Sequence, residues 1–162
     1  MRVSDVVTFC RRLETMGVRL WLDGGWGVDA LLGEQTREHG DLDIVVEQRH
    51  VDRVRDMLEA DGFRNVPRPD TRPCNFVLGH PDGRLIDFHV VTFDAEGNGL
   101  YEPSYTFPAA VFTGQGSIEG FDVRCLSAAH QIARNGYVWR DSDHADVRAL
   151  CARFNLPLPR PS

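Results

Sequence analysis

A glycine pair follows one short apolar segment of this chain, and two aspartates begin the next. The two segments read Trp21-Leu22-Asp23-Gly24-Gly25-Trp26-Gly27 and Asp41-Leu42-Asp43-Ile44-Val45-Val46. Glycines that follow a strand let backbone N–H groups approach a phosphate closely. Aspartates at positions i and i+2 of a strand project from the same face of a sheet. The pattern therefore predicts a strand, a glycine turn, a helix and a second strand, which together hold a metal-bound nucleoside triphosphate.

The spacing of apolar residues predicts further helices and strands. Ser4 is placed to cap the first helix, and Gly17 to end it. We predict helices at 4–16, 26–32, 50–60, 128–134 and 142–154, strands at 18–23, 42–46, 63–66, 74–78, 84–91 and 121–125, and mostly loop at 94–105. The strands at 74–78 and 84–91 form a predicted hairpin. This order indicates an α+β (mixed α/β) domain.

The chain has 162 residues, of which 42% are hydrophobic, so that it is large enough for one domain with a buried core. We expect a single domain over 1–162, with a proline-rich tail at 156–162. The four cysteines, Cys10, Cys74, Cys125 and Cys151, show no metal-ligand spacing. They are typical of free thiols in a reducing compartment. Without an apolar leader or membrane-length segment, the sequence predicts a cytoplasmic protein that does not insert into membranes.

The formal net charge is −6. Non-specific binding to nucleic acid depends on a basic face, so this charge argues against a nucleic-acid partner. An acidic protein is compatible with a cationic small molecule or with a nucleotide neutralised by Mg²⁺.

A third aspartate lies in the segment Leu85-Ile86-Asp87-Phe88-His89. On a strand, Asp87 and His89 share one face while the apolar residues between them share the other. If this strand lies beside the one that carries Asp41 and Asp43, three carboxylates converge. Such a group suits phosphoryl transfer assisted by two metal ions. We assign metal binding to Asp41 and Asp43, and to Asp87 the acceptance of a hydroxyl proton together with a share in metal binding.

Each of these features also has a purely structural interpretation. Two aspartates one residue apart are typical of a solvated strand edge, and a glycine pair is typical of an ordinary turn. Asp87, which lies within an apolar strand, can pair with a nearby arginine because an unpaired buried charge is costly. The order and spacing of the features on predicted strands favour the functional interpretation.

Taken together, Gly24-Gly25-Trp26, the pair Asp41 and Asp43, and Asp87 resemble the nucleotidyltransferases of the DNA polymerase beta superfamily. The block from Trp21 to Asp29 and its continuation from Thr36 to Ile44 resemble the short lincosamide nucleotidyltransferases. They are also similar to the aminoglycoside 2''-nucleotidyltransferases. Later segments of the chain extend the likeness to the lincosamide branch: Asp87-Phe88-His89, Arg124-Cys125-Leu126-Ser127, Gly136-Tyr137 and Asp143-His144-Ala145-Asp146.

The resemblance implies a nucleotidyltransferase fold and the transfer of AMP from ATP to an antibiotic hydroxyl. It also implies two Mg²⁺ ions as cofactor. A lincosamide is the first choice of acceptor and an aminoglycoside the second. A different acceptor, or nucleotide binding without catalysis, stays open. Because a single small domain leaves the acceptor side open, we also expect a homodimer.

Other residues are candidates for substrate contacts. Gly24, Gly25, Arg37 and His39 are placed to contact the triphosphate, Arg37 as a forked donor. For Arg37 the alternative is a local pair with Glu38 or Asp41. Aromatic residues able to line an acceptor site, or simply to pack in the core, are Tyr101, Tyr105, Phe107, Tyr137 and Trp139. Asp143 and Asp146 are placed to meet an amine of a substrate or partner; for Asp143 the alternative is a solvated start of a helix.

Overall fold

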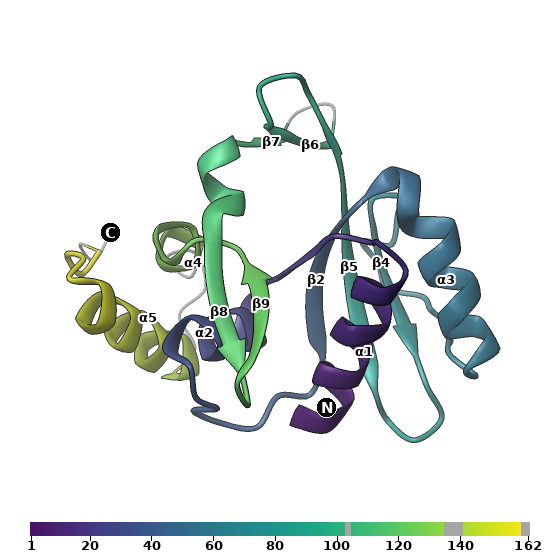
Figure 1. The fold of residues 1–162 in the computed structure, drawn as a ribbon, viewed down its shortest axis with the longest axis horizontal. Helices are drawn as coiled ribbons and strands as arrows, with labels where there is room; N and C mark the ends of the chain where they lie inside the picture. Colours follow the sequence, from purple (N-terminus) through teal and green to yellow (C-terminus); the bar gives the residue numbers. More distant parts are fainter. Residues whose placement is uncertain (103–104, 135–140, 160–162) are drawn as a thin grey trace.

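The computed structural model describes residues 1–102, 105–134 and 141–159, whose helices and strands are shown in Figure 1. The helices are α1 (Val3–Thr15), α2 (Gly24–Leu32), α3 (Val51–Ala60), α4 (Ala128–Arg134) and α5 (Asp141–Phe154), with short 3-10 turns η1 (Gln48–His50) and η2 (Ala109–Thr113). The strands are β1 (Leu20–Leu22), β2 (Leu42–Glu47), β3 (Arg64–Val66), β4 (Asn75–Gly79), β5 (Leu85–Phe93), β6 (Gly99–Glu102), β7 (Tyr105–Phe107), β8 (Gly114–Ile118) and β9 (Phe121–Cys125).

These strands form a mixed sheet. Its main path runs β3-β4-β5-β2-β1-β9-β8, and β6 and β7 continue from β5. The β2–β5 and β1–β9 pairs are parallel, whereas the other pairs are antiparallel. The β6–β7 hairpin projects from the end of β5 beyond the rest of the sheet (Figure 1). The α+β class expected from the sequence is confirmed.

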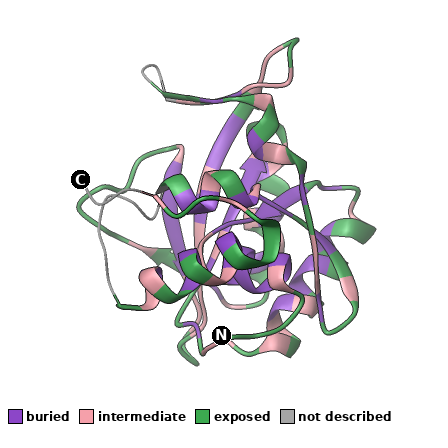
Figure 2. Ribbon diagram, turned by 90° about the vertical axis from the view of Figure 1, so that its left-hand side faces the viewer, coloured by how far each residue is buried: buried purple, intermediate pink, exposed green. Residues whose placement is uncertain are grey.

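The two faces of the sheet have different roles. Leu42, Ile44 and Val46 of β2 are buried in the main core together with residues of α1 and α3. Because side chains alternate along a strand, Asp43 and Val45 lie on the opposite face. Val45 belongs there to a smaller apolar cluster with Trp21, Val91, Phe107, Val111 and Leu126. Burial is concentrated in the strands and the inner faces of the helices (Figure 2). The face that carries Asp43 is thus the one not covered by α1 and α3.

The first helix begins differently from the prediction. Helix α1 starts at Val3, and the carboxylate of Asp5 accepts a hydrogen bond from the backbone N–H of Arg2 at 3.1 Å. Ser4 is exposed and does not cap the helix, so the prediction of a Ser4 cap is wrong. The carboxylate of an acidic residue in the first turn accepts a hydrogen bond from a backbone N–H that has no acceptor within the helix. Its negative charge also interacts favourably with the helix dipole. The helix ends as predicted just before Gly17, which has φ +69°.

Three stretches of the chain differ from the predicted elements. Helix α2 starts at Gly24, so the glycine pair forms its first turn and does not precede it. Residues 94–105, predicted as mostly loop, contain β6 and the start of β7. Strand β8, which pairs with β9 around Glu119 and Gly120, was not predicted. Strand β8 consists of two glycines, a glutamine, a serine and an isoleucine, and β6 has only four residues, so that neither shows the alternating apolar pattern on which strand prediction depends.

Among the described residues, no helix combines the length and the apolar character needed to cross a bilayer.

Candidate active site

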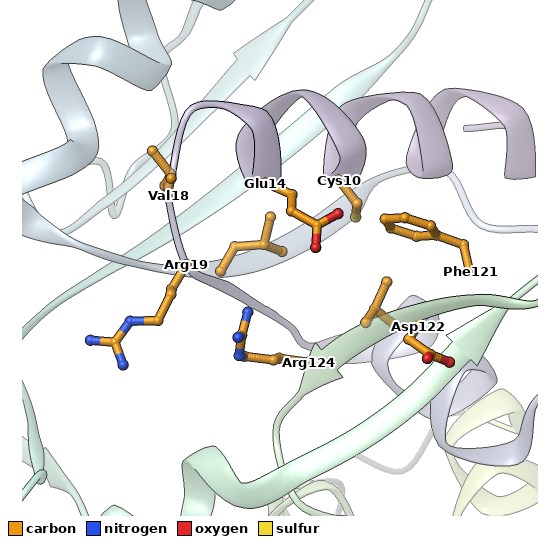
Figure 3. A pocket seen from close by; sticks show the side chains of 10 residues that line it. Cys10, Glu14, Val18, Arg19, Phe121, Asp122 and Arg124 are labelled. Atoms are coloured by element: carbon orange, nitrogen blue, oxygen red, sulfur yellow. The ribbon is translucent and has the colours of Figure 1, made fainter.

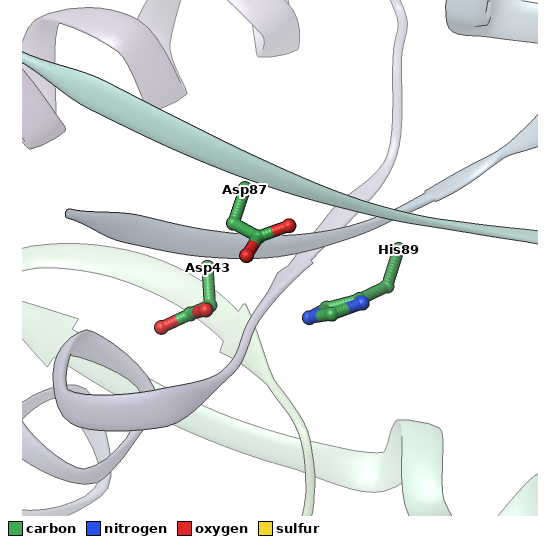
Figure 4. Close-up of side chains that lie close together, drawn as sticks. All are labelled: Asp43, Asp87 and His89. Carbon is green, nitrogen blue, oxygen red and sulfur yellow. The ribbon is translucent and has the colours of Figure 1, made fainter. Parts of the chain in front are cut away.

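Two carboxylates meet across the parallel pair β2–β5. Asp43 and Asp87 are register partners in this pair, and His89 lies two positions further along, opposite Val45. Asp43, Asp87 and His89 each offer a ligand atom, and these atoms all lie within 4.8 Å of one another (Figure 4). All three side chains are half-buried. The structure thus confirms that the strand of Asp87 lies beside the strand of Asp43.

Asp41 is placed differently from Asp43. It lies one residue before the start of β2 and is exposed, outside the group of Asp43, Asp87 and His89. Its part in metal binding stays a prediction. The carboxylate oxygens of Asp43 and Asp87 lie close enough together to fit a hard divalent cation such as Mg²⁺. Mg²⁺ is usually bound by one or two carboxylates together with substrate phosphates.

Gly24 touches the carboxylate of Asp43. A Cβ atom at Gly24 would lie 2.2 Å from Oδ2 of Asp43, and the residue has φ +55°, in the left-handed region. Both features exclude most other residues. The first turn of α2 and the carboxylate on β2 are therefore in direct contact, and the positive end of the α2 dipole faces the site.

Gly25 is required by its contact with His39 and Arg37. A Cβ atom at Gly25 would lie 2.2 Å from Nδ1 of His39 and 3.0 Å from Nη2 of Arg37. The His39 ring is buried between two partners: its Nε2 lies 2.5 Å from Oδ2 of Asp29, and its Nδ1 lies 2.8 Å from Nη1 of Arg37. The predicted nucleotide contacts Gly24, Gly25, Arg37 and His39 therefore lie together at the start of α2.

Arg37 has a partner that the sequence did not suggest. Its Nη2 donates to Oδ2 of Asp146 on α5 at 3.0 Å, over a sequence separation of 109 residues. In the part of the chain that the structure describes, Arg37 forms no ion pair with Glu38 or Asp41; its contact with Glu38 is to the backbone oxygen. Asp143 and Asp146 are both buried. The interpretation of Asp143 as part of a solvated start of a helix is thus wrong.

A cavity of about 350 Å³ opens beside the carboxylates. It is lined by Asp23, His89, Tyr101, Tyr105, Phe107, His130 and Ala133. The rings of Tyr101, Tyr105 and Phe107 pack edge to face, with centroids 4.9 to 6.4 Å apart. Three of the predicted aromatic residues therefore line one pocket, whereas Tyr137 and Trp139 lie outside the described residues. Because His89 belongs both to this pocket and to the carboxylate group, the two are adjacent.

Three residues that line the pocket, Asp23, His130 and Ala133, and Asp29 beside the site were not predicted from the sequence. Asp23 precedes the glycine pair and is buried, and the ring of His130 packs against Phe107. Asp29 is buried where it meets His39 and also accepts from the hydroxyl of Thr36 at 2.7 Å. An aspartate inside the apolar run Trp26-Gly27-Val28-Asp29-Ala30-Leu31 is the signal that could have identified it. His130 has no such signal, because only the fold brings α4 to the pocket.

A second cavity of about 210 Å³ lies between α1 and the strands β1 and β9 (Figure 3). Cys10, Glu14, Arg19 and Arg124 are among its lining residues. Burial raises the pKa of the Cys10 thiol to about 12. This thiol is therefore protonated at neutral pH and is a poor nucleophile or ligand. The cavity contains none of the predicted site residues.

The geometry supports one kind of chemistry. A carboxylate pair, a helix N-terminus and an arginine meet at one end of an open aromatic pocket. A cation held by the carboxylates can neutralise the charge of a polyphosphate. The helix N-terminus and the arginine can donate hydrogen bonds to the phosphate oxygens. A small molecule in the pocket would lie beside Asp87 and His89.

Comparisons with known proteins agree with this arrangement. A family model described as aminoglycoside-2''-adenylyltransferase matches residues 5–150. A lincosamide resistance protein from Staphylococcus haemolyticus is 31% identical over 142 residues, which are 85% of this chain and 86% of that protein. A 2''-aminoglycoside nucleotidyltransferase from Klebsiella pneumoniae is 31% identical over 109 residues, which are 67% of this chain and 58% of that protein.

Two solved structures show the same fold. The lincomycin-bound crystal structure of the lincosamide antibiotic adenylyltransferase LnuA superposes with a TM-score of 0.81 at 29% identity, covering 93% of this chain and 96% of that one. The crystal structure of ANT(2'')-Ia in complex with adenylyl-2''-tobramycin gives a TM-score of 0.76 at 23% identity, covering 94% and 88%.

Proposed function

The chain belongs to the aminoglycoside-2''-adenylyltransferase family, and from this premise we propose that it transfers AMP from ATP to a hydroxyl group of an antibiotic, a lincosamide in the first instance. The reaction forms a bond between the acceptor oxygen and the α-phosphorus of ATP. The bond between the α-phosphorus and the bridging oxygen breaks, and pyrophosphate leaves. The modified antibiotic no longer has that hydroxyl free.

One observation carries the proposal. Asp43 and Asp87 face each other in register, at the point where the first turn of α2 and the aromatic pocket meet. A nucleotide bound at the start of α2 would place its phosphates beside Asp43. An acceptor in the pocket would place its hydroxyl beside Asp87. These positions are those that an in-line transfer between the two substrates requires.

We assign roles to residues as follows. Asp43 and Asp41 would hold Mg²⁺, two ions in the complete site, and Asp87 shares in this binding. Bound Mg²⁺ neutralises the phosphate oxygens and stabilises charge on the leaving pyrophosphate. The carboxylate of Asp87 accepts the proton of the attacking hydroxyl.

The remaining assignments concern the nucleotide. The backbone N–H of Gly25 binds a phosphate oxygen at the start of α2. Gly24, whose own N–H donates to Oδ1 of Asp23 at 2.8 Å, contributes by leaving room for the nucleotide, because it has no side chain. Arg37 donates to the triphosphate, and His39 holds the Arg37 guanidinium in place. An enzyme that consumes ATP works where ATP is supplied, so we place it in the cytoplasm.

The lincosamide assignment rests on the extent of the two similarities. The lincosamide resistance protein covers 85% of this chain and is itself covered to 86%, whereas the aminoglycoside enzyme is covered to 58%. An aminoglycoside 2''-hydroxyl is therefore the second candidate acceptor. We further propose that residues 1–162 act as one nucleotidyltransferase domain and that two copies associate.

Pyrophosphate release from Mg·ATP tests the proposal. The purified protein is incubated with lincomycin, clindamycin, kanamycin, tobramycin or gentamicin. Release that depends on lincomycin or clindamycin supports the lincosamide assignment, and release with tobramycin alone supports the second candidate. No release with any drug, using each of the four common nucleoside triphosphates, contradicts the proposed activity. Sedimentation at working concentration tests the dimer, and a single monomeric species contradicts it.

A further inference from the structure

The C-terminal helix α5 reaches the start of α2 through one carboxylate. Oδ2 of Asp146 accepts a hydrogen bond from Nη2 of Arg37 at 3.0 Å, although 109 residues separate the two along the chain. The side chain of Asp146 is 6% exposed, whereas that of Arg37 is 34% exposed. The carboxylate is therefore enclosed by protein, while part of the arginine side chain stays accessible to a ligand.

The segment before β2 holds a second nitrogen of the same guanidinium. Nη1 of Arg37 lies 2.8 Å from Nδ1 of His39, and Nε2 of that ring lies 2.5 Å from Oδ2 of Asp29. The other carboxylate oxygen of Asp29 accepts from the backbone N–H and the hydroxyl of Thr36, at 3.0 and 2.7 Å. Asp29 lies on α2 and Asp146 on α5, and these two helices contact each other. The guanidinium is thus held between them.

The donors that the protein already uses define what Arg37 can offer to a ligand. A guanidinium has five N–H groups and no acceptor. Nη1 faces His39 and, at 3.4 Å, the backbone O of Glu38, and Asp146 takes one N–H of Nη2. Nε is buried and has no hydrogen-bond acceptor in the part of the chain that the structure describes. The second N–H of Nη2 is therefore the donor that stays available.

This remaining donor lies at the first turn of α2, since a Cβ atom at Gly25 would be 3.0 Å from Nη2 of Arg37. The guanidinium is planar and rigid, so that holding one N–H of Nη2 fixes the direction of the other. We infer that Asp146 is a positioning residue for the nucleotide: it directs the free N–H of Arg37 towards the phosphates that the first turn of α2 binds. The inference rests on the proposed function for its ligand, the triphosphate of ATP.

Position and charge predict opposite effects when Asp146 is removed. Asp146→Ala takes one negative charge away from the phosphates, so that Coulomb attraction alone would make the variant bind Mg·ATP more tightly. If Asp146 orients Arg37, the variant binds more weakly, because the free N–H of Nη2 is no longer directed. A role of Asp146 confined to stability leaves the affinity of the folded protein unchanged.

Calorimetric titration with Mg²⁺ and a non-hydrolysable ATP analogue separates these cases. We expect Asp146→Ala to raise the Kd by about threefold to tenfold, the range of one weakened hydrogen bond. Asp141→Ala, exposed in the first turn of the same helix, is the control and should keep the Kd within about twofold. An unchanged or lower Kd in folded Asp146→Ala would overturn the inference.

A double-mutant cycle shows whether Asp146 acts through Arg37. In Arg37→Ala no guanidinium is left to orient, so that adding Asp146→Ala should not weaken the binding further. Losses that simply add would overturn the positioning role. If Asp146→Ala does not fold, Arg37→Lys decides, because lysine keeps the charge but lacks the planar fork that fixes the direction of its donors. We expect a higher Kd in Arg37→Lys, and an unchanged one would overturn the inference.

The titration also distinguishes this inference from the proposed function, because its result does not depend on which drug is modified. If Arg37→Ala binds the analogue as tightly as the wild type, the proposed contact of Arg37 with the triphosphate is wrong, and the inference is wrong with it. If Arg37→Ala weakens the binding and Asp146→Ala does not, the contact stands and only the positioning role of Asp146 is wrong.

Discussion

At the scale of single residues, the site depends on how closely Gly24 approaches Asp43. The contact is too short for any side chain at Gly24, and the positive φ adds a second restriction. The glycine pair and the aspartates could be identified from the sequence because each stands next to an apolar strand. The exposed position of Asp41 could not be predicted from the sequence, because it depends on where β2 begins.

We predict that Gly24→Ala destabilises the protein and impairs nucleotide binding. The added methyl group strains the backbone and displaces the Asp43 carboxylate, so we expect a loss of about 1 to 3 kcal/mol in the free energy of unfolding and a weaker affinity for Mg·ATP. Gly40→Ala is the control, because its Cβ would meet nothing within 4 Å. Urea denaturation and calorimetric titration with a non-hydrolysable ATP analogue measure both effects. If the two variants have the same free energy of unfolding and the same affinity for the ATP analogue, the close contact between Gly24 and Asp43 is contradicted.

We predict that Asp87→Asn lowers turnover by about 10²-fold to 10⁴-fold, the usual effect of losing a general base. The amide cannot accept the proton of the hydroxyl, although it preserves the shape of the side chain. Binding of Mg·ATP should stay measurable in the variant. Asp56→Asn, on the exposed face of α3, is the matched control and should keep its turnover. Near-normal turnover in Asp87→Asn would exclude Asp87 as the base.

At the scale of elements, apolar periodicity predicts most of the scaffold. Helices α1, α3 and α5 and strands β2, β4 and β5 lie within one or two residues of their predicted positions. The missed strands β6, β7 and β8 are held by tertiary pairing, which a pattern read along one segment does not contain. This matters for function, because the β6–β7 hairpin supplies Tyr101, Tyr105 and Phe107 to the pocket.

The cap of α1 gives a prediction with a defined pH dependence. Hydrogen bonds from the Arg2 side chain lower the pKa of Asp5 below its ordinary value. Asp5 therefore contributes stability that is present above the pKa of the unfolded chain and lost as pH falls through the lowered pKa. Asp5→Ala should cost about 1 kcal/mol in the free energy of unfolding at pH 7.

The difference between wild type and Asp5→Ala should close as the pH is lowered below about 4. Urea denaturation across this pH range measures it. Ser4→Ala is the control, since Ser4 is exposed and does not cap the helix. A larger effect from Ser4→Ala than from Asp5→Ala would restore Ser4 as the cap.

At the scale of the whole molecule, the site is assembled from distant parts of the chain. The ion pair between Arg37 and Asp146 joins the segment before β2 to α5. Helix α5 also contacts α2, whose first turn forms part of the site (Figure 1). The sequence identified Arg37 and Asp146 separately but could not pair them, because nothing local indicates a contact over 109 residues.

We predict that Asp146→Asn lowers the free energy of unfolding by about 2 kcal/mol, the scale of a hydrogen bond to a charged group. The buried carboxylate is replaced by an amide that no longer balances the Arg37 charge. Asp141→Asn, exposed in the first turn of the same helix, should change stability by less than about 0.5 kcal/mol. Thermal unfolding of both variants measures the difference, and equal melting temperatures would show that the pair contributes nothing.

Mass spectrometry of lincomycin after incubation with the protein and Mg·ATP tests the central claim most directly. We expect the drug to gain one adenylyl group, with one pyrophosphate released for each molecule modified. Fragmentation of the product would place the group on a single hydroxyl. Unmodified lincomycin, under conditions in which tobramycin gains an adenylyl group, would contradict the lincosamide assignment. If neither drug is modified by protein that binds Mg·ATP, antibiotic adenylylation itself is wrong.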